Sequence, residues 1–250
     1  MLVLVAGMQK SGSGWCFSLV NDALVAGGFE DAREVRDQYA PQCLNENYNP
    51  GVNRLRKRYI KELISLSHNK DLTFACKTHA PPTDEVEKRI KNGEMSAIYS
   101  FRDPRDVVLS AFDHGIKDRK AGRWPIRGFA RFITLRMAAK WVKKTLLPTW
   151  SKWANTPGVI VVRYEDMLHD PIGQLQRILV HLGISINNNM LSTIVKHYSA
   201  DRIIDSNLKA HLHLNKAKIE RFRKEMTEDD IAYCNVLFAD YLPLMGYSRE

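Results

Sequence analysis

The chain has 250 residues, 44% of them hydrophobic and 26% charged, which indicates one α/β domain over residues 1–250 rather than a disordered or fibrous protein. The net charge of +9 favours an anionic ligand, but the basic residues form no single block, so we expect no nucleic-acid partner. The four cysteines lack the spacing of a metal site or a disulfide framework, and no apolar run is long enough to span a membrane, so we expect a cytoplasmic protein with no membrane partner.

The first element is a predicted buried strand over residues 2–6, which leads directly into a turn rich in glycine and serine. The turn, with the aromatic residue after it, consists of Lys10, Ser11, Gly12, Ser13, Gly14 and Trp15. Between a strand and a helix, such a turn directs several backbone N–H groups at one point, and the start of the helix adds partial positive charge. Because Lys10 adds a full charge, we predict that the turn binds an anion of the phosphate type.

The turn does not follow the nucleotide-binding pattern G-x-x-x-x-G-K-[ST]. With Gly7 and Gly12 as the two glycines, Ser13 stands where the lysine is required and Gly14 where the magnesium-binding hydroxyl belongs. The turn therefore predicts phosphate binding without the chemistry of an NTPase.

Three further apolar runs predict strands, at residues 72–76, 96–101 and 159–163, with enough chain between them for helical crossovers. This alternation predicts an α/β fold with a central parallel β-sheet flanked by helices. Residues 30–58 are expected to form an irregular loop, and residues 127–153 one or two helices whose aromatic side chains belong to the core.

Two helices carry clear boundary signals. One begins at Asp170 and Pro171, an N-cap and a first-turn proline, and ends at Gly183. The other opens at Thr227, and the acidic residues of its first turn suit the helix dipole. Both are assigned to packing rather than to chemistry.

Polar segments come where the predicted strands end. Residues 77–79, which read Lys-Thr-His, and residues 102–106 each follow a strand directly, and residues 163–166 close the fourth strand. Ligands of open parallel sheets bind beyond the carboxyl ends of the strands, so we expect these segments to converge with the glycine-rich turn.

Each candidate side chain also has a purely structural alternative. His79 is placed to accept a proton near neutral pH, or it is a surface or satisfied histidine. Arg102 binds an anion at the strand end, or it forms a salt bridge with Asp103 or Asp106. Ser110 lies on the helix that Asp103 opens, where it reaches the ligand of Arg102 or simply fills the helix.

Four segments together resemble the cytosolic-type sulfotransferases. Each is a weak or moderate signal alone, but all four in order across nearly the whole chain are highly specific. The segments are 10–15, 77–81, 98–110 and 163–166. The resemblance implies that the protein uses the donor 3′-phosphoadenosine 5′-phosphosulfate (PAPS), releases adenosine 3′,5′-bisphosphate (PAP) and needs no metal ion.

The resemblance also implies the roles of individual residues. In such enzymes the turn holds the 5′-phosphosulfate, and its lysine, here Lys10, neutralises charge on the leaving-group oxygen. The histidine of the Lys-Thr-His segment, here His79, takes the proton of the acceptor. Apart from the resemblance, we predict that Lys77 adds positive charge near the sulfuryl group.

The rest of the donor site carries over in the same way. The resemblance assigns the 3′-phosphate to Arg102 and Ser110, places Trp15 and Tyr164 along the nucleotide, and makes Ser199 a further contact to the base. Without the resemblance, Tyr164 reads equally as a core ring or as a wall for a flat base.

Two segments depart from the family pattern. The family has two threonines after the glycine of the turn, whereas Ser13 and Gly14 stand here, so one hydroxyl donor is missing and backbone N–H groups have to bind more of the donor. Near the C-terminus, residues 215–217 replace an Arg-Lys-Gly segment, and Lys216 is the candidate for a further 3′-phosphate contact.

The sequence thus predicts a sulfotransferase that moves the sulfuryl group of PAPS to a hydroxyl, an amine or another nitrogen of a small-molecule acceptor. The reaction is an in-line displacement with His79 as general base, so positioning and charge stabilisation carry the catalysis. Two other classes stay open: a nucleotide-dependent kinase, and a non-enzymatic module that binds anions or polysaccharides. The sequence sets neither the acceptor nor the oligomeric state.

Overall fold

The computed structural model describes residues 1–39, 41–45, 49–122, 128–199 and 218–249. The chain divides into two compact units, one of Met1–Phe101 with Ser151–Leu214 and the other of Arg102–Trp150 with Asn215–Glu250. One domain over residues 1–250 therefore stays a prediction. Within the described ranges, no helix combines the length and the apolar character needed to cross a membrane.

The first unit is built on a five-stranded sheet in the order β2-β3-β1-β4-β5, and every pair of neighbours is parallel. The strands are β1 (Leu2–Gly7), β2 (Gly51–Val52), β3 (Phe74–Thr78), β4 (Met95–Phe101) and β5 (Val159–Arg163). The predicted central parallel sheet is confirmed, and β2 is a strand that the sequence did not predict.

The strand β3 begins and ends two residues later than its apolar run, so Lys77 and Thr78 lie inside the strand rather than after it. The reason is a contact from far along the chain. The N-terminal ammonium of Met1 and the hydroxyl of Ser67 both donate hydrogen bonds to the carbonyl of Leu72, which is thereby withdrawn from strand pairing.

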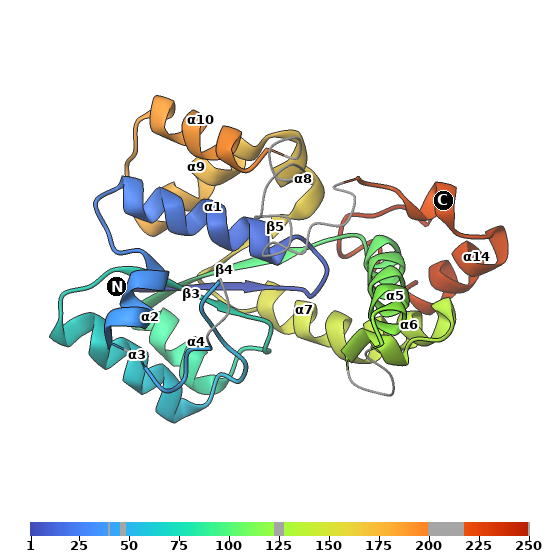
Figure 1. The fold of residues 1–250 in the computed structure, drawn as a ribbon, viewed down its shortest axis with the longest axis horizontal. Helices are drawn as coiled ribbons and strands as arrows, with labels where there is room; N and C mark the ends of the chain where they lie inside the picture. The colour runs from blue at the N-terminus through green and yellow to red at the C-terminus, as the bar shows by residue number, and fades with distance from the viewer. Residues whose placement is uncertain (40, 46–48, 123–127, 200–217, 250) are drawn as a thin grey trace. The chain divides into compact units, whose positions relative to one another are not determined.

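Helices cover both faces of this sheet (Figure 1). Val3 and Val5 belong to a core with residues of α1, α9 and α10, while Leu2 and Leu4, on the opposite face by the alternation of a strand, are equally buried. The unit contains α1 (Ser13–Ala26), α2 (Ala32–Tyr39), α3 (Lys57–Asn69), α4 (Asp84–Lys91), α8 (Tyr164–His169), α9 (Pro171–Leu182) and α10 (Asn188–His197). Helix α7 (Leu147–Ala154) contains the boundary between the units.

The boundary signals of α9 are confirmed. Asp170 is its N-cap and accepts a hydrogen bond from the backbone N–H of Gly173 at 2.9 Å, Pro171 is its first residue, and Gly183 ends it in the left-handed conformation with φ 69°. The irregular loop expected at 30–58 is wrong in part, because this segment contains α2, β2 and the start of α3.

The second unit is helical. It contains α5 (Pro104–Lys120), the 3₁₀ turn η1 (Gly128–Arg131), α6 (Leu135–Trp141), the π-helical turn η2 (Val142–Leu146), α13 (Phe222–Glu225) and α14 (Glu228–Leu237). Helix α5 packs against η1, α6 and α13. The rings of Phe129, Phe132 and Trp141 lie 5.3–6.0 Å apart, which agrees with the expectation of aromatic packing in this segment.

Candidate functional site

The turn after β1, which we call the cradle, leads into the start of α1. Lys10 and Gly12 both have left-handed backbone conformations, with φ 69° and 72°, and Ser11 holds the turn by donating its hydroxyl to the carbonyl of Met8 at 2.6 Å. Helix α1 begins at Ser13, and no side chain caps its first N–H groups. A helix start with uncapped N–H groups and a lysine at its entry has the chemistry that anion binding needs.

Two aromatic residues of the predicted site lie against this cradle. A Cβ atom at Gly12 would come within 2.6 Å of the Tyr164 ring, so only glycine allows this close contact. The rings of Trp15 and Tyr164 meet edge to face with their centroids 6.1 Å apart. The structure thus brings Lys10, Gly12, Trp15 and Tyr164 together, as the sequence predicts.

Tyr198, which directly precedes Ser199, lies at the site and was not identified by the sequence analysis. The indole N–H of Trp15 donates a hydrogen bond to the carbonyl of Tyr198 at 3.1 Å, and the Tyr198 hydroxyl donates to Asp22 at 2.7 Å. These contacts bring the end of α10, and with it Ser199, to the start of α1. No local pattern announces Tyr198, because its partners are more than 170 residues away in the chain.

His79 is the most constrained polar side chain of the site. Its Nδ1 lies 2.6 Å from the carbonyl oxygen of Gly7, and its Nε2 lies 3.1 Å from Nζ of Lys77. A carbonyl oxygen can only accept a hydrogen bond, so Nδ1 carries the proton and Nε2 keeps its lone pair. The pairing of Ala6 with Thr78 explains the contact, because Gly7 is the next residue on β1 and His79 directly follows the end of β3.

Burial and the nearby positive charges keep the ring of His79 neutral. Burial lowers the pKa of His79 to about 3; the positive charges of Lys77 and Lys10 act in the same direction, and the bond to Gly7 opposes them. Burial also lowers the pKa of Lys77 to about 8, so this ammonium stays mostly protonated at neutral pH. The unliganded site is therefore a neutral imidazole between two cations.

Arg102 and Ser110 belong to the second unit. The Arg102 guanidinium lies 2.6 Å from Asp106, whose carboxylate also accepts a hydrogen bond from the backbone N–H of Phe222 at 2.9 Å. Asp103 instead caps α5 and pairs with Arg105. The sequence offered Asp103 or Asp106 as the partner of Arg102, and the salt bridge in the structure is with Asp106. Ser110 is 4% exposed, and its hydroxyl makes no hydrogen bond with a described residue.

Lys216 lies outside the described residues, so its place in the site stays a prediction. Among the residues that the structure does describe, no three His, Cys, Asp or Glu side chains are grouped to hold a metal ion, and all four cysteines are free. The first unit also contains a cavity, and His79, Lys77 and Gln9 form part of its wall.

The low pKa of His79 predicts how stability changes with pH. In the unfolded chain His79 binds a proton near its ordinary pKa of 6.5, whereas the folded protein binds it only at about 3. Between these values the unfolded state binds more protons than the folded state. The free energy of unfolding therefore decreases by up to about 1.4 kcal/mol per pH unit as the pH falls below 6.5. Urea unfolding at pH 7.5 and 5.0 should show this loss for the wild type and a smaller loss for His79→Asn, which keeps a donor to Gly7 but does not titrate.

His68→Asn is the matched control, because His68 is exposed at the last turn of α3 and should leave the pH dependence unchanged. Equal pH dependence in the wild type and His79→Asn would contradict the neutral buried imidazole. The low pKa of Lys77 does not interfere, since its effect on stability falls between pH 8 and 10.5.

A family model described as "Sulfotransferase domain" matches residues 2–246. Among curated proteins, luciferin sulfotransferase of Photinus pyralis is 27% identical over 210 residues, which are 79% of this chain and 55% of that protein. Sulfotransferase 1B1 of Canis lupus familiaris is 22% identical over 238 residues, which are 92% of this chain and 75% of that protein. The chain thus spans about half to three quarters of the length of these relatives.

Solved structures share the fold at lower sequence identity. Retinol dehydratase in complex with androsterone and the inactive cofactor PAP superimposes with a TM-score of 0.62 at 17% identity, covering 96% of this chain and 80% of that one. Mouse sulfotransferase SULT7A1 complexed with PAP gives the same TM-score at 17% identity, and the superposition covers 97% of this chain and 84% of that one.

Proposed function

The chain belongs to the sulfotransferase family, and from this premise we propose that it transfers the sulfuryl group of PAPS to a hydroxyl or nitrogen of a small-molecule acceptor. The observation that carries the proposal is the neutral imidazole of His79, fixed by Gly7 and directed at Lys77, in the electrostatic field of Lys10. This arrangement combines a proton acceptor with two cations, as sulfuryl transfer requires. We retain one cytoplasmic domain over residues 1–250 as part of the proposal.

The donor binds through its 5′-phosphosulfate at the cradle of residues 10–15. The uncapped N–H groups of α1 and the ammonium of Lys10 provide hydrogen-bond donors and charge for this group. Trp15 and Tyr164 form an apolar wall against which the adenine packs, and Ser199 contacts the base. Two of the solved structures with this fold contain PAP, the product that PAPS leaves behind, which supports this choice of donor.

The 3′-phosphate binds Arg102 and Ser110. The carboxylate of Asp106 holds the Arg102 guanidinium in position, and the guanidinium also donates a hydrogen bond to the backbone carbonyl of Lys218. Ser110 adds a hydroxyl that has no hydrogen-bond partner among the described residues. Lys216, from the segment outside the described residues, completes the set as proposed from the sequence.

The reaction uses the Nε2 lone pair of His79. Lys77 occupies this lone pair at 3.1 Å, so an acceptor hydroxyl has to take its place. The displaced ammonium is then free to bind a sulfuryl oxygen, and the negative charge of the bound donor raises the pKa of His79 from its low unliganded value. Binding of both substrates thereby activates the base.

The chemical step is a single in-line displacement. Nε2 takes the proton of the acceptor hydroxyl, whose oxygen forms a bond to sulfur while the bond from sulfur to the bridging oxygen of the donor breaks. The electron pair of that bond stays on the phosphate of PAP, where Lys10 and Lys77 stabilise the charge. The products are PAP and a sulfated acceptor.

The general base is tested by His79→Asn. Loss of general-base assistance should lower turnover about 10²- to 10⁴-fold while PAP still binds, because the nucleotide contacts lie elsewhere. PAP release during turnover and the calorimetric affinity for PAP measure the two effects separately. The control His68→Asn should retain full turnover, and undiminished turnover in His79→Asn would rule out the base.

The 3′-phosphate contact is tested by Ser110→Ala. Loss of a hydrogen bond to a charged group should weaken the binding of PAP by about 1.5 kcal/mol, which is about tenfold in affinity. The affinity for adenosine 5′-monophosphate should not change. Ser192→Ala, at an exposed position of α10, is the control and should bind both nucleotides like the wild type. Equal weakening of both nucleotides would contradict the assignment. Tighter binding of magnesium-ATP than of PAP, with phosphate transfer, would support the kinase alternative instead.

A further inference from the structure

The cavity beside His79 has a volume of about 1280 Å³, and most of its wall is polar or charged. Its described lining contains no Phe, Tyr or Trp side chain. Pockets for apolar small molecules are instead lined mainly by hydrophobic and aromatic side chains. The wall of this cavity therefore favours a polar acceptor over a flat aromatic or steroid-like one.

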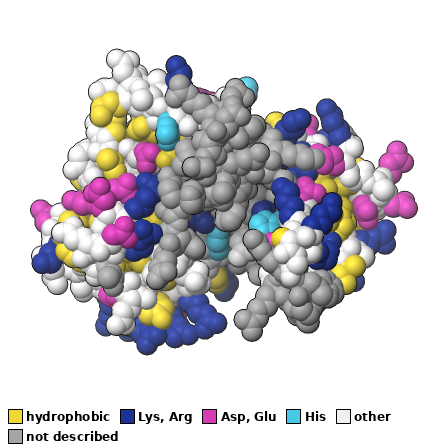
Figure 2. All heavy atoms as spheres, viewed as in Figure 1, with side chains coloured by type: hydrophobic (Ala, Val, Ile, Leu, Met, Phe, Trp, Pro, Cys, Tyr) yellow, Lys and Arg dark blue, Asp and Glu magenta, His cyan; other side chains and the backbone are white. Residues whose placement is uncertain are grey.

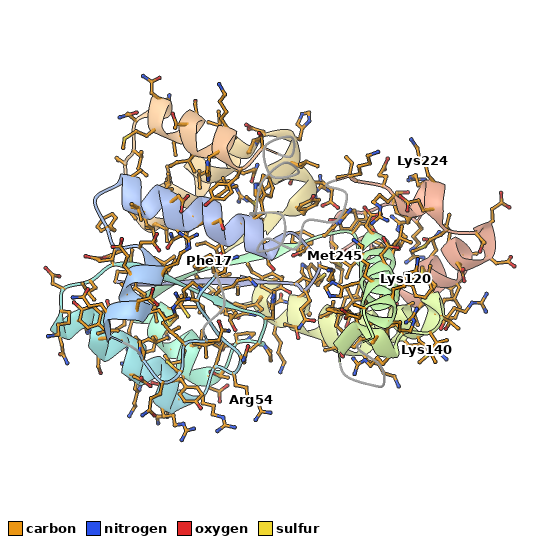
Figure 3. All side chains as sticks on the ribbon, viewed as in Figure 1. Phe17, Arg54, Lys120, Lys140, Lys224 and Met245 are labelled. Atoms are coloured by element: carbon orange, nitrogen blue, oxygen red, sulfur yellow. The ribbon has the colours of Figure 1, made fainter. Side chains whose placement is uncertain are left out.

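Three basic residues of the cavity wall lie in what we call the basic segment, residues 54–57. Arg54, Arg56 and Lys57 are exposed, whereas Leu55 between them is 3% exposed and anchors the segment. Figure 2 shows Lys and Arg side chains gathered along the lower edge of the view, and Figure 3 shows Arg54 extending outward there. Part of the cavity wall thus belongs to a concentration of positive charge.

Little of this charge is neutralised within the described part of the chain. The Arg54 side chain has neither a hydrogen bond nor an ion pair with a described residue, and the described contact of the Arg56 guanidinium is with the Tyr59 ring, at 5.9 Å. The Nζ of Lys57 lies 4.0 Å from the carboxylate of Glu85, but that carboxylate is already bound at 2.8 Å by Arg89. The two arginines therefore have positive charge available for a ligand.

The sheet fixes the basic segment close to His79. Val52 pairs with Thr78, and the Thr78 hydroxyl donates a hydrogen bond to the Val52 carbonyl at 2.9 Å. A Cβ atom at Gly51 would lie 2.6 Å from the carbonyl oxygen of Lys77, so only glycine permits this close pairing. His79 follows Thr78 directly and Arg54 is two residues beyond Val52, so one small molecule can contact both.

Amide groups line the part of the cavity between His79 and the basic segment. Gln9 directly precedes Lys10, the first residue of the cradle, and Asn53 directly precedes Arg54. Both Gln9 and Asn53 line the cavity. Neither side-chain amide forms a hydrogen bond with a described residue. An amide offers both donors and an acceptor, which suits the hydroxyl groups of a carbohydrate or polyol.

We infer that the acceptor is a hydroxyl-rich small molecule that carries a carboxylate or phosphate, held by that anion at Arg54 and Arg56 while one of its hydroxyls meets His79. The inference rests on the proposed function and adds the chemical class of its acceptor. The anion supplies charge-assisted hydrogen bonds to guanidinium groups, and the amides of Gln9 and Asn53 bind the remaining hydroxyls.

Four probe acceptors distinguish the possible classes in assays with PAPS. Glucose is the neutral polyol, glucuronate carries a carboxylate, glucose 6-phosphate carries a phosphate, and 4-nitrophenol is the flat aromatic alternative. The test variant is Arg54→Ala/Arg56→Ala. The control Lys61→Ala/Lys70→Ala removes the same charge from exposed positions of the polypeptide outside the cavity wall.

We expect a kcat/KM at least about tenfold higher for glucuronate or glucose 6-phosphate than for glucose, since charge-assisted bonds are worth about this much. Whichever of these two sugars is preferred identifies the anion. The test variant should raise the KM for that sugar at least about tenfold, with kcat, the KM for glucose and the affinity for PAP unchanged. The control variant should match the wild type.

A preference for 4-nitrophenol that the test variant does not alter would overturn the inference, as would transfer to neither anionic sugar in a protein that binds PAP. These outcomes leave the proposed function standing. Absence of PAP binding together with absence of transfer to every probe would contradict the proposed function itself, and the inference with it.

Discussion

The hydrogen bond between the His79 imidazole and the Gly7 carbonyl is the contact on which the rest of the site depends. It joins the ends of two adjacent parallel strands, fixes the proton on Nδ1 and leaves the Nε2 lone pair directed at Lys77. Glycine is needed at position 7, because a Cβ atom there would lie 2.4 Å from the Ser100 hydroxyl and 2.7 Å from Cβ of Ser13. One backbone carbonyl thus sets both the tautomer and the direction of the proposed base.

The same edge of the sheet concentrates positive charge. Burial lowers the pKa values of both His79 and Lys77, and the charges of Lys77 and Lys10 lower the pKa of His79 further. Like charges held close together destabilise the folded state, so an anion that binds between them stabilises the fold as it binds. The uncapped start of α1 adds to this field. The first unit is therefore built for an anionic ligand, and the polar cavity with its basic segment continues that character away from the turn.

Features that local signals specify could be predicted from the sequence. The glycine-rich turn, the caps of α9 at Asp170 and Gly183, and three of the strands follow from patterns a few residues long. What could not be predicted depends on distant partners. Strand β2 has two residues and exists only through pairing with β3, and β3 is shifted because Met1 holds the Leu72 carbonyl. Helix α2 begins where the amide of Asn21 accepts a hydrogen bond from Ala32, and Tyr198 reaches Trp15 through its backbone. The roles of the site residues, Arg102 and Ser110 included, stay predictions.

The most direct test of the account is the protonation of one imidazole, followed by nitrogen NMR of ¹⁵N-histidine-labelled protein, with His79→Asn used to assign the signal. The account predicts that, without ligand, Nδ1 of His79 carries the proton and Nε2 stays unprotonated from pH 7.5 to 5.0, and that PAP raises the pKa of the ring. A ring that titrates near 6.5 in the unliganded protein, or that carries its proton on Nε2, would contradict it.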